Sequence, residues 1–195
     1  MPADPPGNGR RSPVRIGKYE VVAHIATGGM GAVYRAIDTD LHREVALKVL
    51  PMETAARPAT LERFRREARS AAKLRHDNIV AIYEFGEVAG TYYLALEFVD
   101  GIDLHELVNR QGKLDPETAR HILIQAARAL DHAHQQGIIH RDIKPSNFLI
   151  AQKNDKLIVK LTDLGLAREV NNDEFRITRD GTTVGTVDYM SPEQA

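Results

Sequence analysis

The hydrophobic periodicity of the chain changes once, near residue 100, and this change limits the folds that the chain can adopt. Before it, short β-branched or alternating runs predict strands, and one stretch at 58–74 has helical spacing instead. The strand candidates are YEVVAHIA, GAVYRAID, EVALKVL, IVAIYEF and TYYLALEF. The first hundred residues therefore predict a five-stranded antiparallel sheet with one inserted helix.

Helical spacing dominates the second half. A short segment at 104–108 precedes a long helix, for which Asp115 is the predicted N-cap, Pro116 the first turn and Gly137 the stop signal. Two short strands, FLI and LIVKLT, follow before a polar segment that starts at Asp163. This order predicts an α+β protein. Its predicted parts are a flexible leader at 1–17, a β-rich lobe at 18–99 and a mainly helical lobe at 100–195.

Composition excludes several kinds of site. The 195 residues include no cysteine, which excludes disulfides, thiolate nucleophiles and cysteine-based metal sites. The net charge of −1 offers no general attraction for nucleic acid, so we expect no nucleic acid as a partner. No apolar run approaches the roughly 18 residues that a membrane span needs. We expect a soluble, cytoplasmic chain, and a membrane anchor of the full-length product would lie outside this segment.

A glycine cluster, TGGMGAV at 27–33, lies between two predicted strands. Its context excludes two common nucleotide-binding loops, because a dinucleotide fingerprint opens a helix and a Walker A loop ends in Gly-Lys-Ser/Thr. Here the residues after the cluster continue as a strand. The residues alone leave open a simple hairpin turn and a loop that approaches a phosphate.

Two charged residues lie where the pattern predicts burial. Strand alternation in VALKVL places Lys48 on one face with Ala46 and Leu50, so its side chain points under the sheet. In the helix at 58–74, Glu67 adjoins the apolar stripe. Either charge would be costly to bury alone, whereas a pair offsets much of the desolvation. The alternative is that each side chain reaches solvent separately.

Strongly polar residues interrupt an apolar stretch at 138–150, IIHRDIKPSNFLI. They are His140, Arg141, Asp142, Lys144 and Asn147. Asp163 follows at the end of a later strand. Oxygen atoms from two carboxylates and one amide, those of Asp142, Asn147 and Asp163, are ligands of the kind that hold Mg²⁺ together with phosphate.

Histidines offer another hypothesis, a metal hydrolase that uses His132, His134 and His140. Imidazole is a common metal ligand. However, His132 and His134 are two positions apart on a predicted helix and do not share a face. This arrangement disfavours the hydrolase.

Taken in chain order, these motifs resemble those of protein kinases, and closest to them those of the bacterial eukaryote-like Ser/Thr kinases. The matching parts are the glycine loop, the strand lysine, the helix glutamate, the HRDIKPSN string, an Asp-x-Gly motif and a Pro-Glu near the end. The resemblance runs from Tyr19 to the C-terminus. It implies a bilobal kinase-like fold and a protein serine/threonine kinase, which transfers the γ-phosphoryl group of ATP to Ser or Thr hydroxyls of protein substrates with the help of Mg²⁺.

The resemblance also implies a role for each matching residue. The catalytic group comprises Asp142, Lys144, Lys48 and Glu67. The nucleotide would be contacted by Ala26, Thr27, Gly28, Gly29, Gly31, Val33, Ala46, Lys48, Leu96, Glu97, Val99 and Asp103. The metal ion would be held by Asn147 and Asp163. Regulation would involve Arg141 as a phosphate ligand and the threonines of the activation segment, Thr178, Thr182, Thr183 and Thr186.

The chain stops at Ala195, soon after the Pro-Glu motif, whereas the second lobe of the family continues with further helices. We therefore expect a fragment of a longer kinase or a truncated product. The second case predicts a catalytically impaired nucleotide-binding or interaction module. An exposed surface on the second lobe would then favour self-association.

Overall fold

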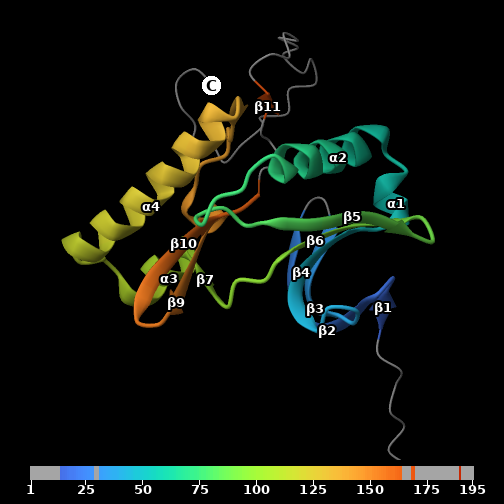
Figure 1. The fold of residues 1–195 in the computed structure, drawn as a ribbon, viewed down its shortest axis with the longest axis horizontal. Coiled ribbons are helices and arrows are strands. Elements are labelled where there is room, and N and C mark those ends of the chain that lie inside the picture. Colours follow the sequence, from blue (N-terminus) through green and yellow to red (C-terminus); the bar gives the residue numbers. More distant parts are fainter. Residues whose placement is uncertain (1–13, 29–30, 164–167, 170–188, 190–195) are drawn as a thin grey trace, which may run out of the picture.

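The computed structural model describes residues 14–28, 31–163, 168–169 and 189 (Figure 1). The strands are β1 (Arg15–Ile16), β2 (Tyr19–Gly28), β3 (Gly31–Asp38), β4 (Arg43–Leu50), β5 (Ile82–Val88), β6 (Thr91–Glu97), β7 (Gly101–Asp103), β8 (Ile138–Ile139), β9 (Phe148–Lys153), β10 (Lys156–Leu161) and β11 (Arg168–Glu169). The helices are α1 (Met52–Ala55), α2 (Pro58–Ala72), α3 (Leu104–Gln111) and α4 (Pro116–Gln135), with a 3₁₀ turn η1 (Pro145–Asn147).

The first lobe is built on an antiparallel sheet with the strand order β1-β2-β3-β4-β6-β5. The sequence predicts five strands and one helix, and the described residues form six strands and two helices. The additional strand β1 pairs Arg15 with Glu20 and Ile16 with Tyr19, inside the segment predicted to be a leader. The additional helix α1 has four residues. Elements this short carry no readable hydrophobic period, which explains why the sequence analysis misses them.

The two faces of this sheet pack differently. One face buries a cluster around Tyr19, Val45, Leu47 and Tyr93. On the other face, Leu50 and Leu94 pack against Phe64 of α2. Figure 1 shows α2 lying along the sheet beside β5. Because successive strand residues alternate between faces, the face under α2 is also the face that carries Lys48.

The second lobe is centred on α4, which begins and ends as the sequence predicts. The Asp115 carboxylate accepts hydrogen bonds from the backbone N–H groups of Glu117 and Thr118, each at 3.0 Å. Gly137 has a φ of 73° just after the helix, a conformation that glycine adopts without strain. Beside α4 lies a small sheet with the order β10-β9-β7. Together these elements confirm the predicted α+β architecture of two lobes.

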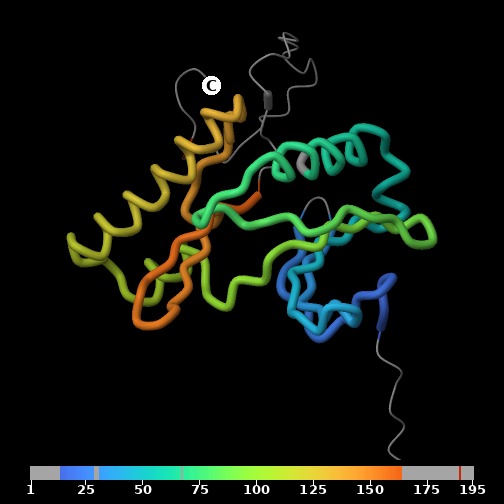
Figure 2. The backbone as a smooth tube through the Cα atoms, in the orientation of Figure 1, coloured from blue at the N-terminus to red at the C-terminus, as the bar shows by residue number. Residues whose placement is uncertain are grey.

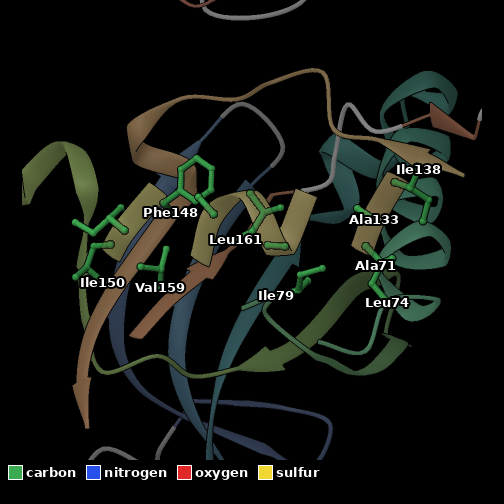
Figure 3. Packing of buried hydrophobic residues seen from close by; sticks show 12 residues of the cluster. Ala71, Leu74, Ile79, Ala133, Ile138, Phe148, Ile150, Val159 and Leu161 are labelled. Carbon is green, nitrogen blue, oxygen red and sulfur yellow. The ribbon is translucent and has the colours of Figure 1, made fainter. Parts of the chain in front are cut away.

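The main core continues from one lobe into the other (Figure 3). Ala71 of α2 and Leu74 just after it belong to the same cluster as Ala133 of α4 and Ile138 of β8. The opposite side of α4 is partly open, and Leu123 is 67% exposed there. Among the described residues, no helix has both the length and the apolar character required to cross a bilayer.

The connection between α2 and β5 joins the lobes by hydrogen bonds. The Val80 N–H donates to the Leu161 carbonyl at 2.9 Å, and the Leu161 N–H donates to the Asn78 carbonyl at 2.8 Å. The buried Asn78 amide donates to Gln125 of α4 and to the Val159 carbonyl of β10, both at 2.9 Å. Figure 2 shows this connection crossing the chain at β10. The segment is therefore fixed to two elements of the second lobe.

Candidate active site

The two ends of the glycine cluster lie on β2 and β3, which pair antiparallel up to Gly28 and Gly31. Gly31 has a φ of 138°, and a Cβ atom placed there would lie 2.0 Å from the Val49 carbonyl oxygen. Only glycine fits such a position without displacing the backbone. The His24 ring and the Thr27 hydroxyl form a hydrogen bond of 2.8 Å at the end of β2. Gly29, also predicted to contact nucleotide, lies outside the described residues.

Strand register brings several residues of the predicted nucleotide site to one face of the sheet. Ala26 pairs with Val33, and Val33 pairs with Lys48. On the next strand, Ala46 pairs with Leu96. Directly paired residues point to the same side of a sheet, so these five side chains share the face that α2 covers only in part. The arrangement offers an apolar surface next to a single ammonium group.

His140 anchors the loop between β8 and η1. Its side chain is buried, and its Nδ1 atom accepts a hydrogen bond from the Asp142 N–H at 3.3 Å. The Nε2 atom therefore carries the proton and donates to the Thr162 carbonyl oxygen at 3.0 Å. Burial lowers the pKa of His140, which keeps the ring neutral in this role. The residue holds the loop against the end of β10 and is not a metal ligand in this geometry.

Three polar side chains of the loop form one connected group. The Lys144 ammonium lies 2.9 Å from the Asp142 carboxylate. The buried Asn147 amide donates to the Asp142 backbone carbonyl at 2.7 Å and to its carboxylate at 3.2 Å. Because its NH₂ group faces Asp142, the amide oxygen of Asn147 points away from that residue. The loop thus holds one carboxylate between a cation and an amide.

Asp163 connects this loop to the first lobe. Its carboxylate accepts a hydrogen bond of 2.8 Å from the Lys48 ammonium. Desolvation alone would raise the pKa of Asp163, but the charge and hydrogen bond of Lys48 outweigh it, so the pKa lies below its usual range. The sequence analysis predicts Glu67 as the partner of Lys48. The Glu67 side chain lies outside the described residues, so that pairing stays a prediction.

Two residues at the site have an unusual backbone conformation. Arg141 has a φ of 65° and Asp163 a φ of 58°. Residues other than glycine rarely adopt the left-handed region, and those that do are concentrated at functional sites. Arg141 is exposed beside Asp142, whose carboxylate faces Lys144. The backbone thus turns sharply at two places in the predicted site, directly before Asp142 and at the predicted metal ligand Asp163.

The segment between the lobes carries the remaining predicted nucleotide contacts, Glu97, Val99 and Asp103. The Glu97 carboxylate pairs with Lys160 of β10 at 2.7 Å and accepts a hydrogen bond from the Ala81 N–H at 3.2 Å. Sequence analysis misses Lys160, because nothing in its own strand indicates a partner so far away in the chain. Asp103 accepts a hydrogen bond from the Glu106 N–H at 2.8 Å and so caps α3. At least one carboxylate oxygen of Asp103, a predicted nucleotide contact, is therefore used to cap α3.

The donor chemistry of the site fits a magnesium ion that is shared with a phosphate. Asn147 and Asp163, the predicted ligands, supply an amide oxygen and carboxylate oxygens, which Mg²⁺ prefers. Within the described part of the chain, no group of three or more His, Asp or Glu is arranged to hold a metal ion by itself. A site with few protein ligands is the kind that Mg²⁺ occupies together with nucleotide phosphates.

The predicted regulatory threonines fall in the part of the chain that the structure does not describe. They are Thr178, Thr182, Thr183 and Thr186. The geometry therefore assigns them no contact, and the roles that the family resemblance implies for them stay predictions.

Comparison with known proteins agrees with this geometry. Residues 19–195 match the family model described as "Protein kinase domain". The serine/threonine-protein kinase PknB of Mycobacterium tuberculosis (strain H37Rv) is 42% identical over 182 residues, which cover 91% of this chain and 29% of the relative. The serine/threonine-protein kinase PrkC of Bacillus subtilis is 44% identical over 179 residues, which cover 92% of this chain and 27% of the relative. The chain thus spans less than a third of the curated relatives it matches, and it belongs to the protein kinase domain family.

Proposed function

We propose that the chain is the ATP-binding and catalytic part of a protein serine/threonine kinase. It would transfer the γ-phosphoryl group of ATP to Ser or Thr hydroxyls of proteins. The observation that carries this proposal is the contact of Lys48 with Asp163, which places the lysine of the first lobe beside the polar loop of the second. The printed names of PknB and PrkC, both serine/threonine-protein kinases, support the acceptor class.

Asp142 would orient the attacking hydroxyl. Its carboxylate is fixed by the Asn147 amide and lies beside the Lys144 ammonium. Such a carboxylate would accept a hydrogen bond from the incoming hydroxyl and take its proton as the new P–O bond forms and the bond from the γ-phosphorus to the ADP leaving group breaks. Lys144, next to it, would stabilise negative charge on the transferred group. Phosphoryl transfer passes through a loose transition state. Positioning of the reactants and neutralisation of charge therefore account for most of the catalysis.

The nucleotide would lie between the glycine cluster and the polar loop. Lys48 would bind its phosphates, while Val33, Ala46 and Leu96 offer the apolar face for the base. The backbone at Glu97 and Val99 would supply hydrogen bonds to the base. Mg²⁺, held by Asn147 and Asp163, would neutralise phosphate charge.

Regulation would involve Arg141 and the threonines of the activation segment. An exposed arginine next to Asp142 can form charge-assisted hydrogen bonds to a phosphothreonine and so couple modification to the loop. We extend the proposal to autophosphorylation at Thr178, Thr182 or Thr183, and to Thr186 as a contact of the loop. A reducing cytoplasm would suit a chain without cysteine. Self-association through the exposed side of α4 stays a prediction.

The decisive experiment measures phosphate transfer from labelled ATP and Mg²⁺ to a generic basic protein. The chain is compared with Asp163→Ala and with Glu87→Ala, which removes an exposed carboxylate of β5 far from the loop. We expect transfer by the chain and by Glu87→Ala, and its loss in Asp163→Ala. Circular dichroism establishes that both variants are folded.

Two outcomes contradict the proposal. Transfer that Asp163→Ala leaves unchanged would come from another enzyme in the preparation. Binding of a fluorescent ATP analogue without any transfer would favour the alternative, a nucleotide-binding module without catalysis.

A further inference from the structure

Two histidines from different lobes pack against each other at the lobe boundary. His76 lies in the connection between α2 and β5, and His132 lies near the C-terminal end of α4. Their ring centroids are 5.1 Å apart, with an angle of 30° between the ring planes. They are 56 positions apart in the sequence, and neither belongs to the motifs that carry the proposed chemistry. Their contact therefore belongs to the joint between the lobes.

Hydrogen bonds link this ring contact to the α2–β5 connection and to the second lobe. The His76 Nδ1 atom accepts a hydrogen bond from the Asn78 N–H at 3.0 Å. Asn78 in turn binds Gln125 of α4 and the Val159 carbonyl of β10. Gln125 precedes His132 by seven positions, about two helical turns, so both lie on the side of α4 that meets the connection. A change at the two rings would act directly on the hydrogen bonds that hold the connection in place.

The environment of the pair is unfavourable to added positive charge. The His132 Nε2 atom is buried and has no hydrogen-bond partner among the described residues. The charged groups that face His76 are Arg128 of α4, Lys160 of β10 and Asp77 of its own connection. Two cations against one carboxylate leave an excess of positive charge. Desolvation, followed by the effect of His132, lowers the pKa of His76, and Asp77 opposes this shift only in part.

We propose that the His76–His132 contact is a proton-sensitive joint, which holds the α2–β5 connection on α4 while the His76 ring is neutral and loosens as that ring is protonated. A protonated His76 ring would be repelled by Arg128 and Lys160 in this desolvated position. Histidine is the residue whose charge ordinarily changes in this pH range. The proposal does not depend on kinase activity.

The direction of the pH effect follows from linkage. The pKa of His76 is lower in the closed joint than in the opened one, where it approaches the ordinary value near 6.5. The contact between the α2–β5 connection and α4 is therefore most stable above about pH 6.5, and its stability falls as the pH falls below that value. Hydrogen exchange of the Val80 and Leu161 amides measures this opening, because both amides donate across the lobe boundary.

The experiment compares the amide protection factors of the wild-type chain at pH 7.5 and pH 5.5 with those of two variants. His132→Phe keeps a ring against His76 but removes the imidazole that helps to lower the pKa of His76. His134→Phe makes the same change at an exposed position of α4. We expect protection of Val80 and Leu161 to fall in the wild type and in His134→Phe, by up to about tenfold for each unit of pKa difference between the open and closed joint. In His132→Phe the fall is smaller.

An equal fall in all three proteins would overturn the proposal. A second measurement requires no variant and covers the case in which His132→Phe does not fold. Direct NMR titration of the histidine rings in the wild-type chain should show His76 titrating below the ordinary range. An ordinary midpoint for His76 would also overturn the proposal.

Discussion

The Lys48 ammonium lies 2.8 Å from the Asp163 carboxylate, although 115 positions separate the two residues in the chain. Lys48 belongs to β4 of the first lobe, and Asp163 follows β10 of the second. This direct ion pair between the lobes brings the end of the Lys48 side chain beside the residue that follows β10. This relationship places the proposed phosphate-binding lysine and the proposed metal ligand in one site.

Replacement of Lys48 by methionine should therefore impair the reaction more than it impairs folding. Methionine keeps the length of the side chain but removes the charge that would face the phosphates. We expect kcat/KM for ATP to fall by at least about a hundredfold. Lys153→Met, at an exposed position of β9, is the matched control and should retain activity. If both variants keep the wild-type kcat/KM, Lys48 has no role in the transition state.

The Glu97–Lys160 pair predicts strong coupling in a double-mutant cycle. Both side chains are largely buried, at 24% and 16% exposed, so removal of one partner leaves the other charge poorly compensated. We expect Glu97→Gln and Lys160→Met each to reduce the free energy of unfolding by about 2 kcal/mol, and the double variant to lose much less than their sum. Urea denaturation measures all four proteins. Additive losses would mean that the two residues do not interact.

The Glu84 carboxylate accepts hydrogen bonds from the hydroxyls of Tyr93 at 2.8 Å and Tyr19 at 2.9 Å. Burial and the bond to Glu84 raise the pKa of Tyr93 to about 12. Its neutral form therefore contributes stability below about pH 10, and this contribution is lost as the pH rises toward 12. We expect the unfolding midpoint to fall over that range in the wild type and to fall less in Tyr93→Phe. Tyr34→Phe, which leaves the Glu84 group intact, should behave as the wild type.

Gly31 should tolerate substitution much less than Gly28. An added Cβ at Gly31 would meet the Val49 carbonyl oxygen at 2.0 Å, whereas a Cβ at Gly28 meets nothing within 4 Å. We expect Gly31→Ala to reduce the free energy of unfolding by more than roughly 2 kcal/mol, and Gly28→Ala by a fraction of that. Thermal denaturation of the two variants tests the difference. Equal losses of stability in the two variants would show that the close approach of Gly31 to the Val49 carbonyl oxygen does not cause the destabilisation.

The sequence predicts the local parts of this fold well. The long strands and α4 have clear periods, and Asp115 and Gly137 mark the ends of α4 by chemistry that acts within a few residues. The polar loop was predicted because its residues are contiguous and match a family motif. Short elements such as β1 and α1 were missed because two to four residues show no period.

Most of the contacts that the sequence does not predict join residues far apart in the chain. Glu97 and Lys160 are 63 positions apart, and only the packing of β10 beside the interlobe segment brings them together. The two isoleucines before the polar loop, Ile138 and Ile139, are equally apolar in the sequence but are buried to different extents. Ile138 is buried, as expected, but Ile139 is 41% exposed, because β8 pairs at its edge with β11 and only one side of that short strand meets the core. Hydrophobicity alone does not say which of two neighbours faces inward.

The left-handed backbone at Arg141 and Asp163 lowers protein stability at two positions of the proposed site. For an L-residue this conformation costs on the order of 1 kcal/mol, and glycine would remove that cost. A search for thermostable variants that monitors folding alone should therefore favour glycine at Arg141, whereas at Asp163 the gain competes with loss of the ion pair to Lys48. Glycine at either position would also remove a side chain from the proposed site, so under the proposed function selection for stability and selection for turnover favour different residues there.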